Sequence, residues 1–274
     1  MSSKFNIAIM IPTRGRSTAL EKSVRSVVEL AAHPEKLQLL FAFDNDDTVG
    51  LPYFTDHLQP WLDSQNIEYT AVSLDRLGYR RLNVYYNELA KHADADWLMC
   101  WGDDSIIETD HWDQTVTAYN GQFKLLKVHT HNEHPYSIFP ICPREWYDMF
   151  GWVSRHQMVD AELSQMAYML DLVEIIDMYV THDRADLTKN NNDATQKAKI
   201  MLEGNPNSPL DFHNPAFGTA RITDCEKISK YLESLGQDIT WWKNVKLGQQ
   251  DPWEKLRLND INKQMFQYTL KVQQ

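Results

Sequence analysis

Two adjacent carboxylates stand directly after a short apolar run of the sequence. Residues 97–101 (WLMCW) lead into Gly102, Asp103 and Asp104. Neighbouring carboxylates at a strand end repel each other, and a cation between them relieves that repulsion. Hard oxygen ligands that meet a diphosphate suit Mg²⁺ or Mn²⁺. An isolated acidic pair is more often a solvated turn, so the interpretation depends on the residues around it.

Other apolar runs also end in polar side chains that could do chemistry. In open α/β sheets, ligands bind beyond the carboxyl ends of the strands, so such groups should converge in space. A neutral imidazole can join two carboxylates around an ion, and guanidinium groups match phosphate oxygens in bidentate geometry. The groups concerned are Pro12, Thr13, Arg14 and Arg16 after residues 5–11, Asp44 after residues 37–43, Arg80 and Arg81 at the start of a helical stretch, and His182 after residues 173–180.

Short apolar runs alternate with helical patterns over the first 180 residues, which predicts an α/β fold with a mostly parallel sheet flanked by helices. Thr18 and Glu21 have the spacing of a capping box, and Gly151 should close a helix. The predicted strands are 5–11, 37–43, 67–72, 97–101, 123–128, 137–141 and 173–180. The predicted helices are one from about 18, then 80–92, 112–119, 144–150, one from about 160, 222–235 and 252–270.

The formal net charge of −11 argues against broad attraction to nucleic acid or to anionic membranes. The apolar run near the N-terminus is too short for a signal peptide, and no segment approaches the roughly 18 apolar residues of a membrane helix. Three widely spaced cysteines fit neither a disulfide framework nor a zinc finger. These features predict a cytoplasmic protein.

The order of the motifs resembles glycosyltransferases of the nucleotide-sugar-binding A-type (GT-A) fold, particularly the family 2-like group, over roughly residues 5–185. The matching segments are IPTRGR at 11–16, FDNDD at 43–47, LGYRRLNVYYNELA at 77–90, WGDDSII at 101–107, FPICPREWYDMFG at 139–151 and VTHDR at 180–184. The resemblance implies a Rossmann-like catalytic core at 1–185, and we expect 186–274 to be a loop-rich and helical extension packed on it.

The resemblance also implies roles for particular residues. Pro12, Thr13, Arg14 and Asp44 would contact the nucleotide. The segment with Asp103 and Asp104 is similar to the DXD motif, which places both near a metal ion, Mn²⁺ or Mg²⁺, and Asp103 near the sugar nucleotide. Gly102 departs from the pattern, because an acidic residue often stands there. The metal site would be completed by His182, and the donor site by Arg16, Gly78, Arg81 and Asn83.

Asp160 is the candidate catalytic base. Transfer with inversion needs a carboxylate to accept the proton of the attacking hydroxyl. In family 2-like enzymes this residue opens a helix, and Asp160 and Glu162 lie at such a position. A helix N-cap is the structural alternative for Asp160.

The sequence therefore predicts a metal-dependent transferase that moves a sugar from a nucleotide diphosphate sugar to a hydroxyl acceptor, with inversion. The acceptor would be a saccharide or, less favoured by the acidic charge, a hydroxylated base in DNA. Nucleotidyltransferases share the architecture but carry a glycine-rich phosphate loop, and a non-catalytic sugar- or nucleotide-binding module is the other alternative. Trp101, Trp112, Trp146 and Trp152 could stack on a sugar or a base.

Overall fold

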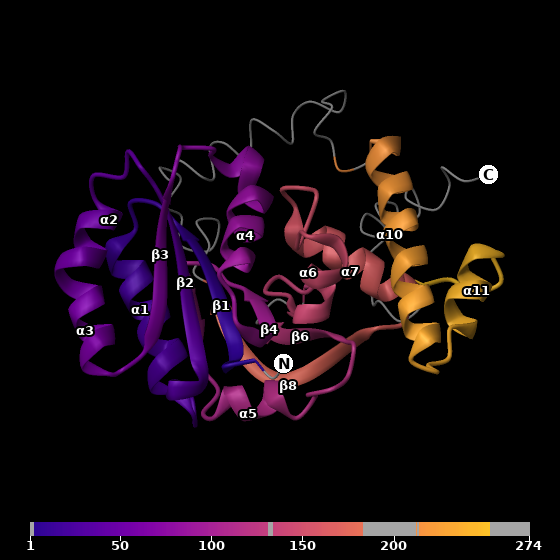
Figure 1. The fold of residues 1–274 in the computed structure, drawn as a ribbon, viewed down its shortest axis with the longest axis horizontal. Coiled ribbons are helices and arrows are strands. Elements are labelled where there is room, and N and C mark those ends of the chain that lie inside the picture. Colours follow the sequence, from indigo (N-terminus) through magenta and orange to yellow (C-terminus); the bar gives the residue numbers. More distant parts are fainter. Residues whose placement is uncertain (1–2, 131–133, 183–211, 213, 253–274) are drawn as a thin grey trace.

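The computed structural model describes residues 3–130, 134–182, 212 and 214–252 (Figure 1). Eight strands form one sheet in the order β3-β2-β1-β4-β7-β6-β8-β5. The strands are β1 (Phe5–Thr13), β2 (Leu37–Asp44), β3 (Glu68–Leu74), β4 (Ala95–Cys100), β5 (Ser105–Ile107), β6 (Leu125–Thr130), β7 (Ile141–Pro143) and β8 (Val173–His182).

The sheet is mostly parallel, as the sequence predicts. Strand β1 pairs in parallel with β2 and β4, β2 with β3, and β6 with β8. The pairs β4–β7, β6–β7 and β5–β8 are antiparallel. Strand β7 is antiparallel to both β4 and β6, so β6 and its parallel neighbour β8 run in the same direction as β4. The carboxyl ends of β1, β2, β4 and β8 therefore meet at one edge of the sheet.

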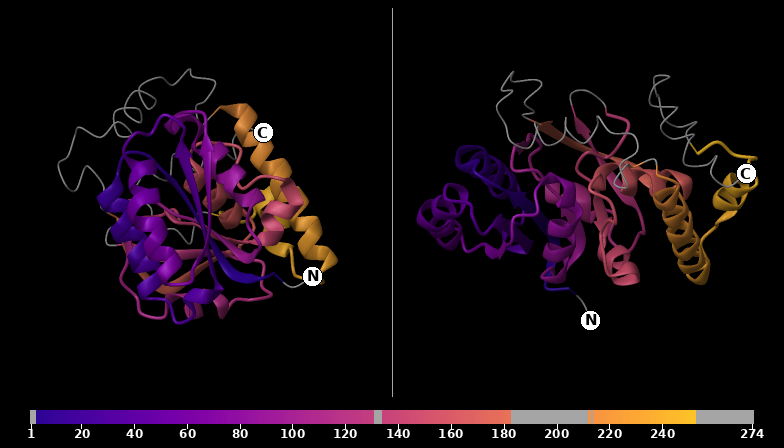
Figure 2. Two further views of the ribbon diagram at one scale, coloured as in Figure 1. Left: turned by 60° about the vertical axis from the view of Figure 1, so that its left-hand side comes forward. Right: turned by 90° about the horizontal axis from the view of Figure 1, so that it is seen from above.

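Helices cover both faces of the sheet (Figures 1 and 2). One face carries α1 (Ser17–Glu29), α2 (Gly50–Tyr53), the π-helical turn η2 (Phe54–Leu58), α3 (Gln59–Ser64) and α5 (Trp112–Thr117). The other carries α4 (Leu82–Lys91), α6 (Arg144–Phe150), α7 (Val159–Met169), α10 (Pro215–Ser234) and α11 (Thr240–Lys246). Two 3₁₀ turns, η1 (Pro34–Lys36) and η3 (Tyr79–Arg81), lie in connections.

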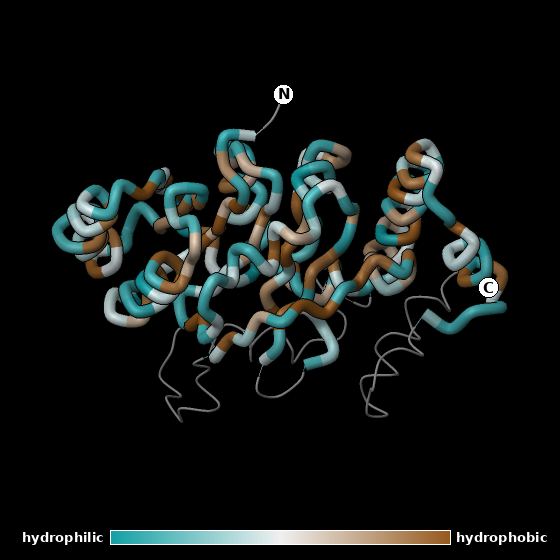
Figure 3. Tube along the Cα trace, turned by 90° about the horizontal axis from the view of Figure 1, so that it is seen from below, coloured by the Kyte–Doolittle hydropathy of each residue, from teal (hydrophilic) through white to brown (hydrophobic). Residues whose placement is uncertain are grey.

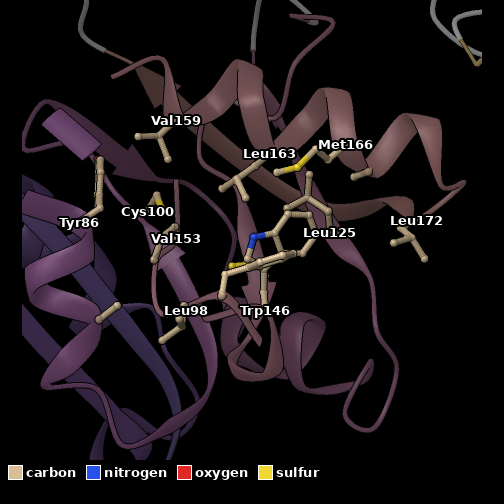
Figure 4. Packing of buried hydrophobic residues seen from close by; sticks show 14 of the residues in the cluster. Tyr86, Leu98, Cys100, Leu125, Trp146, Val153, Val159, Leu163, Met166 and Leu172 are labelled. Carbon is tan, nitrogen blue, oxygen red and sulfur yellow. The ribbon is translucent and has the colours of Figure 1, made fainter. Parts of the chain in front are cut away.

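Strand side chains alternate between two hydrophobic clusters, one on each face. Ala8 and Met10 of β1 belong to the cluster under α4, α6 and α7, whereas Ile7, Ile9 and Ile11 belong to the cluster under α1 and α3. Figure 3 shows hydrophobic stretches along the strands in the middle of the molecule. Figure 4 shows how α7 packs on the sheet, with Leu163 and Met166 beside Trp146 and Leu125. Burial on both faces explains why the first strands read as continuous apolar runs.

Helices α10 and α11 pack on the sheet-facing helix α7. Cys225 and Ile228 of α10 and Trp242 of α11 are buried in the same cluster as α7. The boundary near residue 185 stays a prediction, and the expected helix at 252–270 lies outside the described residues except at Pro252. In the described part of the chain no helix is long and apolar enough to cross a membrane.

Several local predictions are wrong. Helix α1 begins at Ser17 after Arg16 without a side-chain cap, and the Glu21 carboxylate instead binds Tyr53 and Arg25, so Thr18 and Glu21 form no capping box. Helix α10 begins at Pro215 rather than 222, with the Asn214 side chain as its cap. Strand β7 covers only the end of the predicted run 137–141, and β5 was not predicted.

The tryptophans proposed for stacking are mostly core residues. Trp101 and Trp112 are 0% exposed and Trp146 is 1% exposed, so none of them offers a ring face to a ligand. The Trp101 indole donates to Ser23 Oγ, and the Trp112 indole donates to the Val27 carbonyl. The Trp146 indole N–H, in contrast, has no hydrogen-bond partner among the described residues.

Asp113 gives the first testable prediction, because its buried carboxylate holds the chain after α1. It accepts hydrogen bonds from the backbone N–H groups of Ala32, at 2.7 Å, and His33, at 2.9 Å. We expect Asp113→Ala to lower the free energy of unfolding in urea by about 2 kcal/mol, because both N–H groups lose a charged acceptor. The exposed Asp110→Ala is the control and should stay within about 0.5 kcal/mol of the parent. Equal effects of the two changes would contradict this role.

Candidate functional site

The Asp103–Asp104 pair lies in the turn between β4 and β5, at the carboxyl edge of the sheet. Asp103 is 6% exposed. The turn is tight, because a Cβ atom on Gly102 would lie 2.9 Å from Asp104 Oδ1 and 3.0 Å from Ser105 Oγ. A side chain at residue 102 would therefore push against Asp104.

The loop after β1 supplies two partners to the acidic pair. Thr13 Oγ1 donates to Asp103 Oδ2 at 2.7 Å. Arg16 Nη1 lies 2.9 Å from Asp103 Oδ1 and 3.0 Å from Asp104 Oδ2, so one guanidinium nitrogen bridges both carboxylates. Strands β1 and β4 are neighbours in parallel register, and this register brings the two loops together.

His182 reaches the pair through the pairing of β5 with β8. Ser105 is the register partner of His182, so the first residue of β5 lies beside the last residue of β8. This pairing places His182 Nε2 3.2 Å from Asp104 Oδ1. The His182 ring packs edge-on against Phe139, and among the described residues its buried Nδ1 atom has no hydrogen-bond partner. Residues 78 positions apart in the sequence thus meet at one point.

The two carboxyl groups of the pair have different environments. Burial raises the pKa of Asp103, and the Arg16 charge only partly opposes this effect. Burial also acts on Asp104, but the hydrogen bond and charge of His182, together with Arg16, leave its pKa below the ordinary value. Two adjacent buried carboxylates thus depend on nearby cationic and hydrogen-bonding groups.

Asp44, at the end of β2, belongs to a second polar cluster beside the first. Arg14 Nη1 lies 2.9 Å from Asp44 Oδ2 and also pairs with the exposed Asp46. The Tyr85 hydroxyl donates to Asp44 Oδ1 and accepts from the Leu77 N–H at 2.9 Å. Burial and the hydrogen bond to Asp44 raise the pKa of Tyr85 to about 12, so the phenol stays protonated at neutral pH. Tyr85 was not predicted; its place on the buried face of the helix at 80–92 was the available signal.

Asp47 fixes the loop that carries the two arginines. Its carboxylate accepts from the backbone N–H of Gly15 at 2.9 Å, of Val49 at 3.0 Å and of Gly50 at 2.8 Å. Gly15 has a φ of 65°, a left-handed conformation that favours glycine. Within the acidic cluster after β2, Asp44 and Asp46 pair with Arg14. Asp47 instead connects the loop after β1 to the loop after β2 through backbone hydrogen bonds.

The remaining donor-site candidates make no hydrogen bond or ion pair with the acidic pair within the described residues. Pro12 is opposite Ala42 in the β1–β2 ladder, and Arg81 is exposed at the end of η3. Gly78 has a φ of 67°, and its N–H donates to the Tyr85 hydroxyl at 3.3 Å. Asn83 donates to the carbonyl of Arg155 at 2.9 Å and so braces that loop. Their contacts with a nucleotide stay predictions.

Asp160 is the second residue of α7, after the N-cap residue Met158, so it is not the N-cap. It lies near the buried Tyr86, whose pKa is raised well above its usual value by burial and by Cys100, Asp103, Asp160 and Asp104. The charges of Asp160 and of the acidic pair therefore act on the same phenol, whose hydroxyl donates to the Trp101 carbonyl. Figure 4 shows Tyr86, Cys100 and Val159, the neighbour of Asp160, in the same part of one buried cluster.

Glu162 has a structural role. It is 1% exposed, and its Oε2 atom accepts from Ser154 Oγ and from the N–H groups of Arg155 and His156. These bonds fix the loop before α7. Of the two acidic residues in the first turn of α7, Asp160 is thus the one with a partly exposed side chain.

The donor atoms at this edge suit a hard divalent cation. Asp104 Oδ1 and His182 Nε2 are 3.2 Å apart, close to the roughly 3 Å between neighbouring ligands of an octahedral ion bound at about 2.1 Å. Across the residues that the structure describes, no three His, Cys, Asp or Glu side chains form a metal-holding group. Asp103 is instead engaged by Thr13 and Arg16, and the Arg16 guanidinium takes the bridging position between the carboxylates.

The protein belongs to the α/β class, because an eight-stranded sheet carries helices on both faces. Its candidate site lies beyond the carboxyl ends of the strands, where acidic side chains gather. No protein-family model matches the chain, and no curated protein matches it. Solved structures do match. A mannosyltransferase, PcManGT from Pyrobaculum calidifontis in complex with GDP-Man and Mn²⁺, has a TM-score of 0.54 at 12% identity, covering 99% of this chain and 87% of its own.

The S. aureus protein TarS (residues 1–349), in complex with UDP-GlcNAc, has a TM-score of 0.56 at 11% identity, covering 97% of this chain and 80% of its own. At such identity these likenesses show the fold. The chain has the GT-A fold, the fold of these glycosyltransferases. This confirms the predicted fold class, and membership of family 2 stays a prediction.

Tyr85 gives a prediction for the second polar cluster. We expect Tyr85→Phe to lower the free energy of unfolding by about 2 kcal/mol, because Asp44 and the Leu77 N–H both lose their partner. Hydrogen exchange at Leu77 should become faster, because this N–H then lacks an acceptor. Tyr119→Phe is the control, since the Tyr119 hydroxyl makes no hydrogen bond within the described residues. Unchanged exchange at Leu77 would contradict the role assigned to Tyr85.

Proposed function

We propose that the protein is a metal-dependent glycosyltransferase that moves a sugar from a nucleotide diphosphate sugar to a hydroxyl acceptor with inversion. The observation that carries the proposal is the meeting of Asp103, Asp104, His182 and Arg16 at the carboxyl edge of a GT-A sheet. This edge is where open α/β folds bind their ligands. The structural likeness to glycosyltransferases supports the same reading at the level of fold.

In this proposal the two polar clusters divide the donor between them. Asp44, Thr13, Arg14 and Pro12 bind the nucleoside side, and Gly78, Arg81 and Asn83 border it. Asp103, Asp104 and His182 hold Mn²⁺ or Mg²⁺, which would neutralise the diphosphate as it leaves. The Arg14 and Arg16 guanidinium groups lie at the same edge, and their planar donors match phosphate oxygens.

Asp160 serves as the general base. Its carboxylate is partly exposed at the start of α7, beside the phenol that also borders the acidic pair. A carboxylate there accepts the proton of an attacking hydroxyl while the donor is held by the strand-end loops. The helix N-terminus favours the ionised carboxylate, which is the form a base needs.

The donor and acceptor classes follow from weaker evidence. PcManGT and TarS were solved with GDP-Man and UDP-GlcNAc respectively, so both guanine and uracil donors belong in any test. A saccharide hydroxyl is the proposed acceptor. The net charge of −11 disfavours DNA, where phosphate repulsion would oppose binding. A cytoplasmic setting stays a prediction.

The proposal predicts metal-dependent donor binding. In a thermal-shift panel of UDP, GDP, TDP and CMP sugars, we expect one donor to raise the melting temperature with Mn²⁺ and to lose most of this effect with EDTA. Ligand binding stabilises the native state by about 2.7 kcal/mol at a hundred times Kd. Stabilisation by nucleoside triphosphates alone would favour a nucleotidyltransferase, and the absence of any shift would contradict the proposed donor site.

The proposed base predicts a separation of binding from turnover. Asp160→Asn should keep the donor-induced shift in melting temperature but lower the rate of nucleoside diphosphate release, measured with a panel of saccharide acceptors, by at least about 100-fold. Asp177→Asn, an exposed carboxylate on β8, is the matched control and should keep the parent rate. Full turnover in Asp160→Asn would remove this residue from the chemistry.

A further inference from the structure

Arg16 already occupies the position of a cation between Asp103 and Asp104. A single nitrogen, Nη1, lies 2.9 Å from an oxygen of Asp103 and 3.0 Å from an oxygen of Asp104. Thr13 Oγ1 and His182 Nε2 take the other oxygen of each carboxylate. All four carboxylate oxygens of the pair therefore have a partner within this chain.

The Arg16 guanidinium is well suited to this position. Its side chain is 24% exposed, so the ion pairs are partly shielded from water. Removing water strengthens the attraction between opposite charges and makes an unpaired carboxylate costly. Because Arg16 is the residue before α1, its backbone is anchored beside the pair. A tethered cation competes with a free ion at a high effective concentration.

We infer that Arg16 is an internal counter-cation that competes with a divalent metal for the Asp103–Asp104 pair, so that the metal binds tightly only when a diphosphate takes over the guanidinium. The inference rests on the proposed function for the diphosphate, but the competition itself concerns only Arg16, the acidic pair and the metal. In this exchange the metal replaces the Arg16 guanidinium as the cation at the two carboxylates.

This exchange couples the two ligands of the site. A metal that binds without nucleotide must displace Arg16 from both carboxylates, so the guanidinium loses these two ion pairs. A diphosphate offers the guanidinium new oxygens, so it removes this cost from metal binding. By thermodynamic linkage the metal must improve diphosphate binding by the same factor. Removing the arginine charge should therefore tighten metal binding in the absence of nucleotide. It should also weaken the coupling between metal binding and diphosphate binding.

The test measures Mn²⁺ binding to the full chain by electron paramagnetic resonance and calorimetry at neutral pH, without nucleotide. We expect Arg16→Gln to bind Mn²⁺ about tenfold more tightly than the parent, whereas Arg16→Lys, which keeps the charge, should stay near the parent. Arg25→Gln is the matched control, because Arg25 also pairs with two carboxylates, Glu21 and Glu29, and makes no ion pair with Asp103 or Asp104 within the described residues. It should leave Mn²⁺ affinity unchanged.

The same proteins are then compared with UDP and GDP present. In the parent, the nucleotide that binds should strengthen Mn²⁺ binding by more than it does in Arg16→Gln. Arg16→Gln should also melt at a lower temperature without metal and regain stability with Mn²⁺, because the ion replaces the lost cation. If the variant is largely unfolded, failure of Mn²⁺ to restore folding overturns the inference.

Equal or weaker Mn²⁺ affinity in Arg16→Gln overturns the inference, as does an equal gain in Arg25→Gln or the absence of Mn²⁺ binding in every protein. Failure of both nucleotides to bind contradicts the proposed function instead, and the comparison without nucleotide still decides whether Arg16 competes with the metal. The two failures therefore have different signatures.

Discussion

The burial of two adjacent carboxylates at the end of β4 is the constraint on which the rest of this edge depends. Asp103 is almost wholly buried, and like charges so close together require cationic and hydrogen-bonding partners. Each partner comes from a different element: Thr13 from β1, Arg16 from the residue before α1, and His182 from the end of β8. The parallel pairing of β1 with β4 and the pairing of β5 with β8 are what hold these elements together.

Much of this arrangement could be predicted from the sequence. Strands β1, β2 and β4 are buried on both faces, so they read as continuous apolar runs, and the polar residues after them fall at one edge because parallel strands end together. His182 also follows a predicted strand and could be expected at this edge, but its place beside the acidic pair at a metal site was implied by the family resemblance. This place depends on β5, a three-residue strand whose pattern is too short to recognise and whose position is set by pairing with β8.

Other misses have equally local causes. Glu21 has the correct spacing for a capping box, but Tyr53 and Arg25 offer its carboxylate stronger partners once the fold has formed. The tryptophans looked suited to stacking on sugars, yet the space between α1, α5 and the sheet takes Trp101 and Trp112 completely. Tyr85 and Asp47 could not be singled out, because a helical tyrosine and one aspartate among several carry no sign of a long-range partner. Tertiary contacts decided each of these cases.

The two arginines after β1, Arg14 and Arg16, differ in their ion-pair partners. This difference determines which ion pairs a ligand must break. Arg14 is about a third exposed and pairs with the exposed Asp46 and the buried Asp44, and the other oxygen of Asp44 accepts from the Tyr85 hydroxyl. Arg16 bridges two shielded carboxylates, where loss of one partner of a buried pair costs about 3 to 5 kcal/mol. An anionic ligand that recruits Arg14 leaves one carboxylate, Asp44, with the Tyr85 hydroxyl still bound to it. A ligand that recruits Arg16 leaves two adjacent carboxylates, so another cation must take over the acidic pair.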